Sequence, residues 1–180
     1  MRITAGELRG RVLKIPDLPG LRPTPAKVRQ ALFNILGPVD GLELLDLFSG
    51  SGVMALEAIS RGVSSVVSIE QDRRQVRDME QIRESWDLSE SWQIKALTVQ
   101  KGLVLLAGQQ YDLVFADPPY RQGFAEKVPL WLDEHHIGCD RLIIEESAKE
   151  TPFWPAGWVC EQSRRYGDTN LHFLIRASGI

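Results

Sequence analysis

The stretch that most constrains the fold is the apolar run of residues 44–48, which leads into a glycine-rich turn at Gly50 and Gly52. Helix-prone residues 53–59 follow at once, so the stretch predicts a strand, a tight loop and a helix. The glycines would let the backbone approach a ligand closely. The start of the helix would point unpaired amides and the positive end of its dipole at the same place. We expect this loop to hold a small polar group.

An acid follows the next apolar run at the distance expected for a ribose contact. Glu70 lies twenty residues after Gly50 and ends the run of residues 66–69, which predicts a second parallel strand. A carboxylate at this place can accept hydrogen bonds from both hydroxyls of a ribose. Because residues 50–55 also fit the G-x-G-x-x-A fingerprint of dinucleotide-binding proteins, a nicotinamide-dependent dehydrogenase is an alternative on this motif alone.

A further strand-like run, residues 111–116, ends in Asp117, Pro118, Pro119 and Tyr120. Neither proline has an amide donor, so the carboxylate and the carbonyls of this turn only accept hydrogen bonds. Acceptors in a row suit the two hydrogens of an exocyclic amine, and Tyr120 offers a flat face on which a base could stack. Bonds from the amine to Asp117 and the Pro118 carbonyl would direct the nitrogen lone pair at a methyl group held beside the glycine-rich loop. This chemistry needs no metal.

The order of the predicted elements indicates an α/β fold. After a helix at residues 24–36, for which Thr24 is the expected cap, strands and helices alternate up to a fifth buried strand at residues 141–145. This alternation favours a mostly parallel sheet with helices on both faces. Residues 157–163 and 171–175 break it and predict a C-terminal antiparallel hairpin, for seven strands in all. We expect a single domain over the 180 residues.

The chain carries a net charge of −3, but basic residues gather at its N-terminus. Residues 1–29 contain seven lysines and arginines and two acids, a net charge of +5, whereas the remainder carries −8. A β-hairpin predicted at residues 1–21, ahead of a core at residues 22–180, would place these charges on one face, where they could contact phosphate. A solvated charged hairpin is the alternative. The residues that we predict to contact nucleic acid are Arg2, Arg9, Arg11, Lys14 and Arg22.

Composition narrows the setting in which the chain works. It has two cysteines, Cys139 and Cys160, and neither a signal peptide nor an apolar run long enough to cross a bilayer. We therefore expect a cytoplasmic protein with free thiols and no membrane partner. His135 and His136 would diverge by about 100° on a helix, so we expect no metal site there.

Two motifs together carry a family resemblance. Asp-x-Phe-x-Gly-x-Gly at residues 46–52 and the tetrapeptide at residues 117–120 resemble the S-adenosylmethionine-dependent amino-methyltransferases. Further stretches are similar to the RsmD family, guanine-N2 methyltransferases of small-subunit ribosomal RNA. These stretches are residues 1–11, 21–25, 28–36 and 165–169. The resemblance covers nearly the whole chain. It implies a Rossmann-like class I methyltransferase fold, S-adenosylmethionine as cofactor, and small-subunit ribosomal RNA, alone or in an assembling subunit, as partner. We expect a monomer.

The resemblance also implies a role for each candidate site residue. The residues implied to line the methionine part of the cofactor are Asp46, Phe48, Ser49, Gly50 and Gly52. Glu70 would bind its ribose, and the tetrapeptide Asp117, Pro118, Pro119 and Tyr120 would receive the guanine amine and carry the catalytic step. Thr98 stands near the place where many members of the superfamily have an acidic or amide residue that bonds the adenine amine.

Other functions share these motifs. An amino-methyltransferase acting on adenine or cytosine in DNA or RNA could use the same tetrapeptide, although a DNA enzyme would usually carry a target-recognition domain for which 180 residues leave no space. Glutamine-modifying relatives typically have asparagine in place of Asp117. A nucleotide-binding ribosome assembly factor without catalysis is a third alternative. We interpret Asp117 as a solvent-accessible strand end, and Glu145 and Glu146 as a solvated one, whereas Tyr120 could instead pack structurally.

Overall fold

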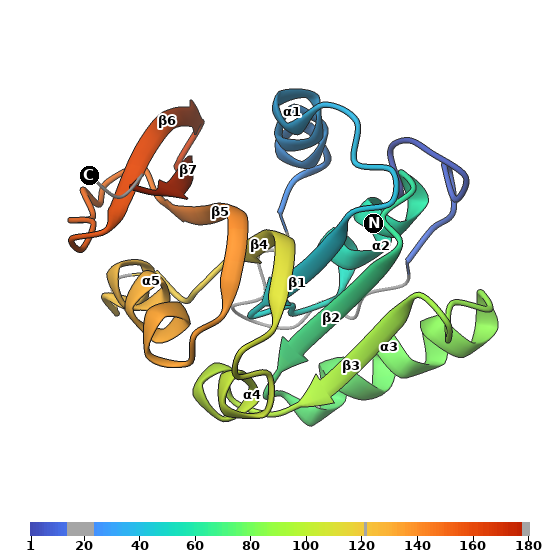
Figure 1. The fold of residues 1–180 in the computed structure, drawn as a ribbon. Helices are drawn as coiled ribbons and strands as arrows, with labels where there is room; N and C mark the ends of the chain where they lie inside the picture. The colour runs from blue at the N-terminus through green and yellow to red at the C-terminus, as the bar shows by residue number, and fades with distance from the viewer. Residues whose placement is uncertain (14–23, 121, 178–180) are drawn as a thin grey trace.

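The computed structural model describes residues 1–13, 24–120 and 122–177 (Figure 1). Its helices are α1 (Ala26–Leu36), α2 (Val53–Ser60), α3 (Arg73–Ser85), α4 (Val99–Leu105) and α5 (Phe124–Glu134). Its strands are β1 (Glu43–Leu47), β2 (Ser65–Glu70), β3 (Trp92–Ala96), β4 (Gln110–Ala116), β5 (Gly138–Ser147), β6 (Trp158–Tyr166) and β7 (Thr169–Arg176). None of the described helices is both long and apolar enough to cross a bilayer. The predicted contacts Lys14 and Arg22 lie outside the described residues.

The seven strands form one sheet in the order β3-β2-β1-β4-β5-β7-β6. Strands β1 to β5 are parallel, and β7 runs antiparallel to both β5 and β6. Figure 1 shows β3 at one end of the twisted sheet and the β6–β7 hairpin at the other. The predicted α/β fold, with its mostly parallel sheet and C-terminal hairpin, is confirmed. Because the strand order reverses between β1 and β4, the loops that follow these two strands diverge and leave a crevice at the carboxyl edge.

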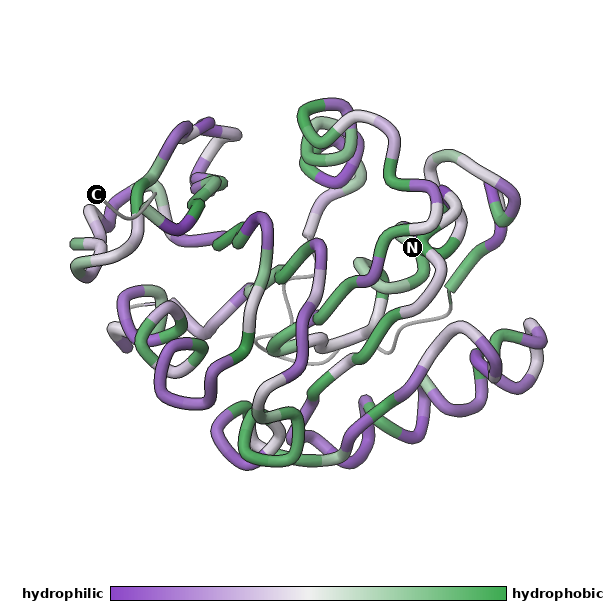
Figure 2. Tube along the Cα trace, viewed as in Figure 1, coloured by the Kyte–Doolittle hydropathy of each residue, from purple (hydrophilic) through white to green (hydrophobic). Residues whose placement is uncertain are grey.

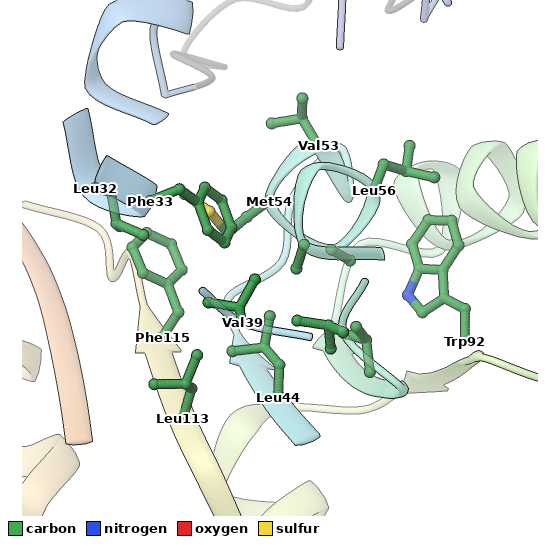
Figure 3. Packing of buried hydrophobic residues seen from close by; sticks show 14 of the residues in the cluster. Leu32, Phe33, Val39, Leu44, Val53, Met54, Leu56, Trp92, Leu113 and Phe115 are labelled. Carbon is green, nitrogen blue, oxygen red and sulfur yellow. The ribbon is translucent and has the colours of Figure 1, made fainter. Parts of the chain in front are cut away.

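Alternation along the strands divides the core between the two faces of the sheet. Leu44 packs with residues of α1, α2 and α3, whereas Leu45 and Leu47 pack with residues of α4 and α5. Figure 3 shows the first of these clusters, where Phe33 of α1 meets Met54 of α2 above the sheet. Figure 2 shows hydrophobic residues along the central strands and hydrophilic ones along much of α3. Both sheet faces are therefore covered, which explains the near-continuous apolar runs of the parallel strands.

The N-terminal segment is more closely integrated than the predicted hairpin. Its antiparallel pairing consists of one bridge, between Arg2 and Val12, and residues 5–10 form bends and turns. Three apolar side chains of the segment are buried in the main core, namely Ile3, Leu8 and Leu13. Gly6 makes this possible, because an added Cβ would lie 1.5 Å from the Ser60 carbonyl oxygen. The start of the chain is thus packed against the end of α2.

A buried ion pair fixes α1 against α2. Arg29 Nε bonds Glu57 Oε2 at 3.3 Å, and both side chains are almost fully buried. The Arg29 guanidinium also donates to the carbonyls of Thr24 and Arg2, at 2.6 and 2.7 Å. Arg29, which the sequence counts among the basic N-terminal residues, is therefore unavailable to phosphate. The predicted helix cap is wrong as well, because Pro25 holds the cap position and the Thr24 hydroxyl donates to Glu145 instead, at 3.0 Å.

The second glycine of the predicted loop has a packing role. Gly52 has a φ of +72°, and an added Cβ would lie 2.7 Å from Trp92 and 2.8 Å from the Met79 sulfur. Gly52→Ala is expected to lower the free energy of unfolding by about 2 to 4 kcal/mol, from overpacking and from the left-handed backbone. Urea denaturation measures this change. Gly108→Ala is the matched control, since Gly108 has a φ of +78° with nothing within 4 Å of an added Cβ. An equal loss in both variants would contradict the packing role.

Candidate active site

A pocket of about 570 Å³ opens at the carboxyl edge of the sheet. This volume suits a ligand of nucleoside size. Its walls come from the ends of β1, β2, β3 and β4 and from the segments that follow them. The lining residues are Phe48, Ile69, Glu70, Gln71, Asp72, Gln75, Leu97, Thr98, Val99, Gln100, Asp117, Pro118, Pro119, Tyr120, Gln122 and Phe124. The structure thus brings the predicted tetrapeptide together with Phe48, Glu70 and Thr98, whereas Asp46, Ser49, Gly50 and Gly52 do not line the pocket.

Glu70 braces the loops at the pocket floor. Its Oε2 accepts the Gly50 amide at 2.8 Å, and its Oε1 accepts the Asp72 amide at 2.7 Å. Asp72 in turn caps α3 by accepting the Arg74 amide at 2.8 Å. Because the Gly50 amide already bonds a carboxylate, and the Gly52 amide bonds the Ser49 carbonyl at 2.8 Å, neither donor is left for a pyrophosphate.

Two phenylalanines form an aromatic wall of the pocket. Phe48 follows β1 with a φ of +59°, a conformation that side-chain-bearing residues rarely adopt. Its ring lies 5.8 Å from that of Phe124, centroid to centroid, at the start of α5. The unusual turn thereby aims Phe48 at the pocket. The sequence does not distinguish Phe124 as a site residue, because an aromatic residue at a helix start is equally typical of core packing.

Asp46 is a buried carboxyl group with an incomplete set of partners. Its side chain is 1% exposed, and Oδ2 accepts only a long bond from the Ser68 hydroxyl, at 3.4 Å. Oδ1 has no partner among the described residues. The Ser49 hydroxyl donates to the Asp46 main-chain carbonyl at 2.8 Å. Burial raises the pKa of Asp46 to about 7, with a smaller contribution from the charge of Glu70. A cationic group near Asp46 would lower this pKa and relieve the burial of its charge.

Asp117, which follows β4, and Glu145, on β5, lie on the same face of the sheet as Asp46 of β1. Ala116 pairs with Ile144 in the parallel ladder, so Asp117 follows β4 at the level of Glu145. Burial raises the pKa of Asp117 well above its usual range, and the charges of Glu145 and Asp46 raise it further. The sequence interpretation of Glu145 and Glu146 as a solvated strand end is wrong, because each is only 3% exposed. Asp117 is half-buried, less accessible than predicted.

Glu145 joins three distant segments beside the tetrapeptide. Its Oε1 accepts the Tyr120 hydroxyl at 3.4 Å, and its Oε2 accepts the Thr24 hydroxyl at 3.0 Å. The Tyr120 hydroxyl also lies 3.2 Å from the Thr169 hydroxyl at the start of β7. Burial raises the pKa of Tyr120 to about 12, so its hydroxyl stays protonated and able to donate. These bonds hold the hydroxyl of Tyr120, a residue that lines the pocket.

The described lining of the pocket is acidic. Among the described residues that line it are three carboxyl groups, those of Glu70, Asp72 and Asp117, and neither lysine nor arginine. Gln75, which the sequence gave no reason to select, also lines it, with a buried Oε1 that has no partner among the described residues. A ligand that carries positive charge and a hydrogen-bond donor would complement this set of acceptors.

The basic N-terminal residues do not join the pocket. The Arg11 guanidinium lies 5.1 Å from the ring centre of Trp86, at the far end of α3 from the pocket residue Asp72. The 13 residues of α3 span about 20 Å between these two points. Arg2 and Arg9 are exposed on the same N-terminal segment, whose Glu7 amide bonds Ser60 at the end of α2. Their predicted contact with nucleic acid stays a prediction.

Comparison with known proteins supplies the family. The profile of the family described as conserved hypothetical protein 95 matches residues 1–175. The chain belongs to this family. Ribosomal RNA small subunit methyltransferase D of Escherichia coli (strain K12) is 35% identical over 98% of this chain and 90% of its own length. The putative rRNA methyltransferase YlbH of Bacillus subtilis (strain 168) is 29% identical over 95% of this chain and 96% of its own. The predicted membership of the RsmD family is confirmed.

Solved structures extend the family resemblance to the fold. The putative methyltransferase yhhF from Escherichia coli has a TM-score of 0.86 at 30% identity, covering 98% of this chain and 97% of its own. The putative methylase HI0767 from Haemophilus influenzae has a TM-score of 0.81 at 26% identity, covering 98% of both chains. SMU.776, a putative methyltransferase complexed with SAH, shares the fold with a TM-score of 0.64 at 15% identity over 83% of this chain and 48% of its own. The Rossmann-like methyltransferase fold is thereby confirmed.

The unpaired carboxyl group of Asp46 should cost stability. Because its pKa is about 7 in the folded protein and about 4 when unfolded, the folded state binds the proton more tightly, and stability should fall as pH rises from about 4 to 7. Asp46→Asn is therefore expected to stabilise the protein at pH 8, by up to about 4 kcal/mol, and to flatten this pH dependence. Urea denaturation at pH 5 and 8 tests this, with the exposed Asp140→Asn as control. A destabilised Asp46→Asn variant at pH 8 would disprove it.

Proposed function

We propose that this protein transfers a methyl group from S-adenosylmethionine to the exocyclic N2 amine of a guanine in small-subunit ribosomal RNA. The observation that carries the proposal is the tetrapeptide Asp117–Tyr120, which lines one pocket with Glu70 in a chain 35% identical to an enzyme named for small-subunit rRNA methylation. The amine-accepting chemistry of the tetrapeptide and the name of the relative point to the same class of reaction.

The pocket fits the proposed cofactor by charge. S-adenosylmethionine supplies an electrophilic methyl group on a positively charged sulfonium and carries an ammonium group as well. The buried Asp46, with its unpartnered Oδ1, and the carboxyl groups that line the pocket favour such a cation. Glu70 keeps lone pairs for the ribose hydroxyls beside its two amide bonds. Phe48 and Thr98 would bound the cofactor on either side, with Ser49, Gly50 and Gly52 shaping the loop behind it.

The tetrapeptide would hold the guanine amine. The Asp117 carboxylate and the Pro118 carbonyl would each accept one amine hydrogen, which localises the nitrogen lone pair for attack. The Tyr120 ring would stack on the base, and Pro119 would keep the turn rigid. Tyr120 needs a fixed orientation for this role, and its bonds to Glu145 and Thr169 supply it.

The proton released from the amine needs an acceptor. Burial raises the pKa of Asp117 well above that of an ordinary carboxyl, and Glu145 and Asp46 raise it further. A carboxylate with a raised pKa is a stronger base, so Asp117 would accept the proton more readily than an exposed aspartate. No metal takes part in this scheme, and the described residues contain no cluster of metal ligands.

Labelling separates the proposed function from its alternatives. The protein is incubated with labelled S-adenosylmethionine and, separately, with small-subunit ribosomal RNA, assembling small subunits and duplex DNA, and the labelled nucleoside is mapped. We expect label on guanine N2 in ribosomal RNA. Label on adenine or cytosine would identify the amino-methyltransferase alternative, and cofactor binding without transfer to any of the three would favour a non-catalytic assembly factor. Sedimentation of the purified protein tests the expected monomer.

Asp117→Ala is expected to lower methyl transfer by about 100- to 1000-fold, as loss of a preorganised polar group does in other enzymes. Cofactor affinity, measured by calorimetry, should fall much less than turnover, because Glu70, Asp46 and the glycine-rich loop are untouched and only one of the acidic groups near the cation is lost. The exposed Asp140→Ala is the control for the loss of one negative charge. If Asp117→Ala binds both substrates and turns over at nearly the original rate, Asp117 is a turn residue.

Glu145→Gln is expected to move the acid limb of turnover to lower pH. Turnover needs Asp117 ionised, so the rate should fall as pH drops through the raised pKa of Asp117. Replacing Glu145 removes one of the charges that raise this pKa. Glutamine keeps one oxygen that can accept from Tyr120 or Thr24, and its NH2 group can donate to the other hydroxyl oxygen. A pH profile of turnover measures the shift, with the exposed Glu134→Gln as control. An unmoved acid limb would show that Glu145 does not act on Asp117.

A further inference from the structure

The sheet order places the two proposed substrates on opposite sides of the pocket. Glu70 ends β2 and Thr98 follows β3, so the cofactor side faces one end of the sheet. Asp117 and Tyr120 follow β4, on the side of β5, β7 and β6. The bond from Tyr120 to Thr169 brings the β6–β7 hairpin directly beside the proposed base site. If the proposed function holds, RNA approaches from this end of the sheet.

Arg164 stands on the pocket face of this hairpin. The strand pairing places four residues in a row across the sheet, namely Asp117 after β4, Glu145 on β5, Leu171 on β7 and Arg164 on β6. Three strand spacings of about 4.8 Å put Arg164 roughly 14 Å from Asp117 along the row. Leu171 belongs to the core cluster on this face, and paired residues share a face, so Arg164 projects on the same side as Asp117.

Its neighbour Arg165 projects to the other face. Ser163 lies two residues before Arg165 on β6 and therefore on the same face of the sheet. Its hydroxyl lies 2.8 Å from His172 Nδ1, and the His172 ring packs edge-on against Trp154, which belongs to the core cluster on the other face of the sheet from Leu171. Arg165 also donates from Nε to the Gly167 carbonyl at 2.9 Å, within the hairpin turn. The two adjacent arginines therefore have equal charge and similar exposure but opposite directions.

The base site creates a need for positive charge. Asp117, Glu145 and Glu146 would repel the phosphates on either side of a base bound at the tetrapeptide. Arg164 is exposed and forms no ion pair with any described carboxyl group. The N-terminal arginines cannot supply this charge locally, because that segment packs by α2 and α3, away from the hairpin end of the sheet (Figure 1).

We propose that Arg164 binds a backbone phosphate next to the target guanine and so holds the RNA strand while its base occupies the pocket. The hairpin that carries Arg164 is anchored on the catalytic side, since the Ala148 amide bonds the Asp168 carbonyl at 2.8 Å. Together with the bond between Tyr120 and Thr169, this anchor fixes the distance from the phosphate contact to the tetrapeptide. This inference rests on the proposed function and adds a residue of the RNA-binding surface to it.

Binding of in vitro transcribed small-subunit ribosomal RNA, titrated between 50 and 200 mM salt, tests the proposal. Arg164→Ala is expected to bind about 10-fold more weakly, and the slope of log affinity against log salt should decrease in magnitude by about 0.7 to 0.9, as for one lost phosphate contact. Arg164→Lys should restore the slope, because it keeps the charge. The KM for RNA should rise while kcat and cofactor affinity are unchanged.

Arg165→Ala is the matched control and should affect RNA binding much less than Arg164→Ala. If Arg164→Ala leaves the slope unaltered in a protein that methylates RNA, or if Arg165→Ala loses as much affinity as Arg164→Ala, the assignment of Arg164 is overturned and the proposed function stands. If the unaltered protein neither binds nor methylates ribosomal RNA, the proposed function fails, and the role of Arg164 with it. Thermal unfolding of each variant confirms that the hairpin is intact.

Discussion

Three carboxyl groups on one face of the sheet, two of them buried and the third half-buried, are the constraint on which the site depends. Asp46, Asp117 and Glu145 come from β1, β4 and β5, neighbours at the point where the strand order reverses. Burial is the main cause of a raised pKa in each of the three. The charges of Asp46 and Glu145 raise the pKa of Asp117 further. Protein interiors normally pair such groups with cations. Leaving them unpaired stores an electrostatic cost that a positively charged ligand would relieve, which is typical of binding sites.

A second buried network shows the contrasting case of a satisfied carboxylate. Glu57 bonds Arg29 and Arg61 and accepts the Thr4 amide, so its charge is fully compensated. Arg29 then holds the carbonyl of Thr24, whose hydroxyl reaches Glu145. The two networks thus meet at the segment before α1. Through it, packing of the N-terminal segment against α2 fixes one of the partners of Glu145, and Glu145 holds Tyr120.

The sequence was sufficient for the fold and for bringing Glu70 and the tetrapeptide to one pocket, because both follow from local rules. Strand patterns ending in Gly50, Glu70 and Asp117 place those residues at the carboxyl edge of any parallel sheet. It was insufficient where burial depends on distant segments. The sequence indicates a solvated strand end at Glu145, whereas in the structure Glu145 is buried and bonded to Tyr120 and Thr24, which come from distant segments. Thr24 and Pro25 likewise have the composition of a helix start, but the tertiary bond to Glu145 overrides the local cap.

Gly52 and the basic N-terminal residues show that a sequence motif predicts where a residue lies better than it predicts what the residue does there. Gly52 fits a fingerprint for close approach to a ligand, yet what it admits is the Trp92 ring and the Met79 side chain. The +5 charge of residues 1–29 predicts a phosphate-binding face, yet Arg29 is buried and Arg11 lies about 20 Å from the pocket end of α3. The net charge of a segment does not say where its residues lie, and the fold puts Arg29 inside the core and Arg11 at the far end of α3. An RNA held at both the N-terminal segment and the hairpin would have to cross the face of the domain, so contacts at the two ends would report on different parts of one substrate.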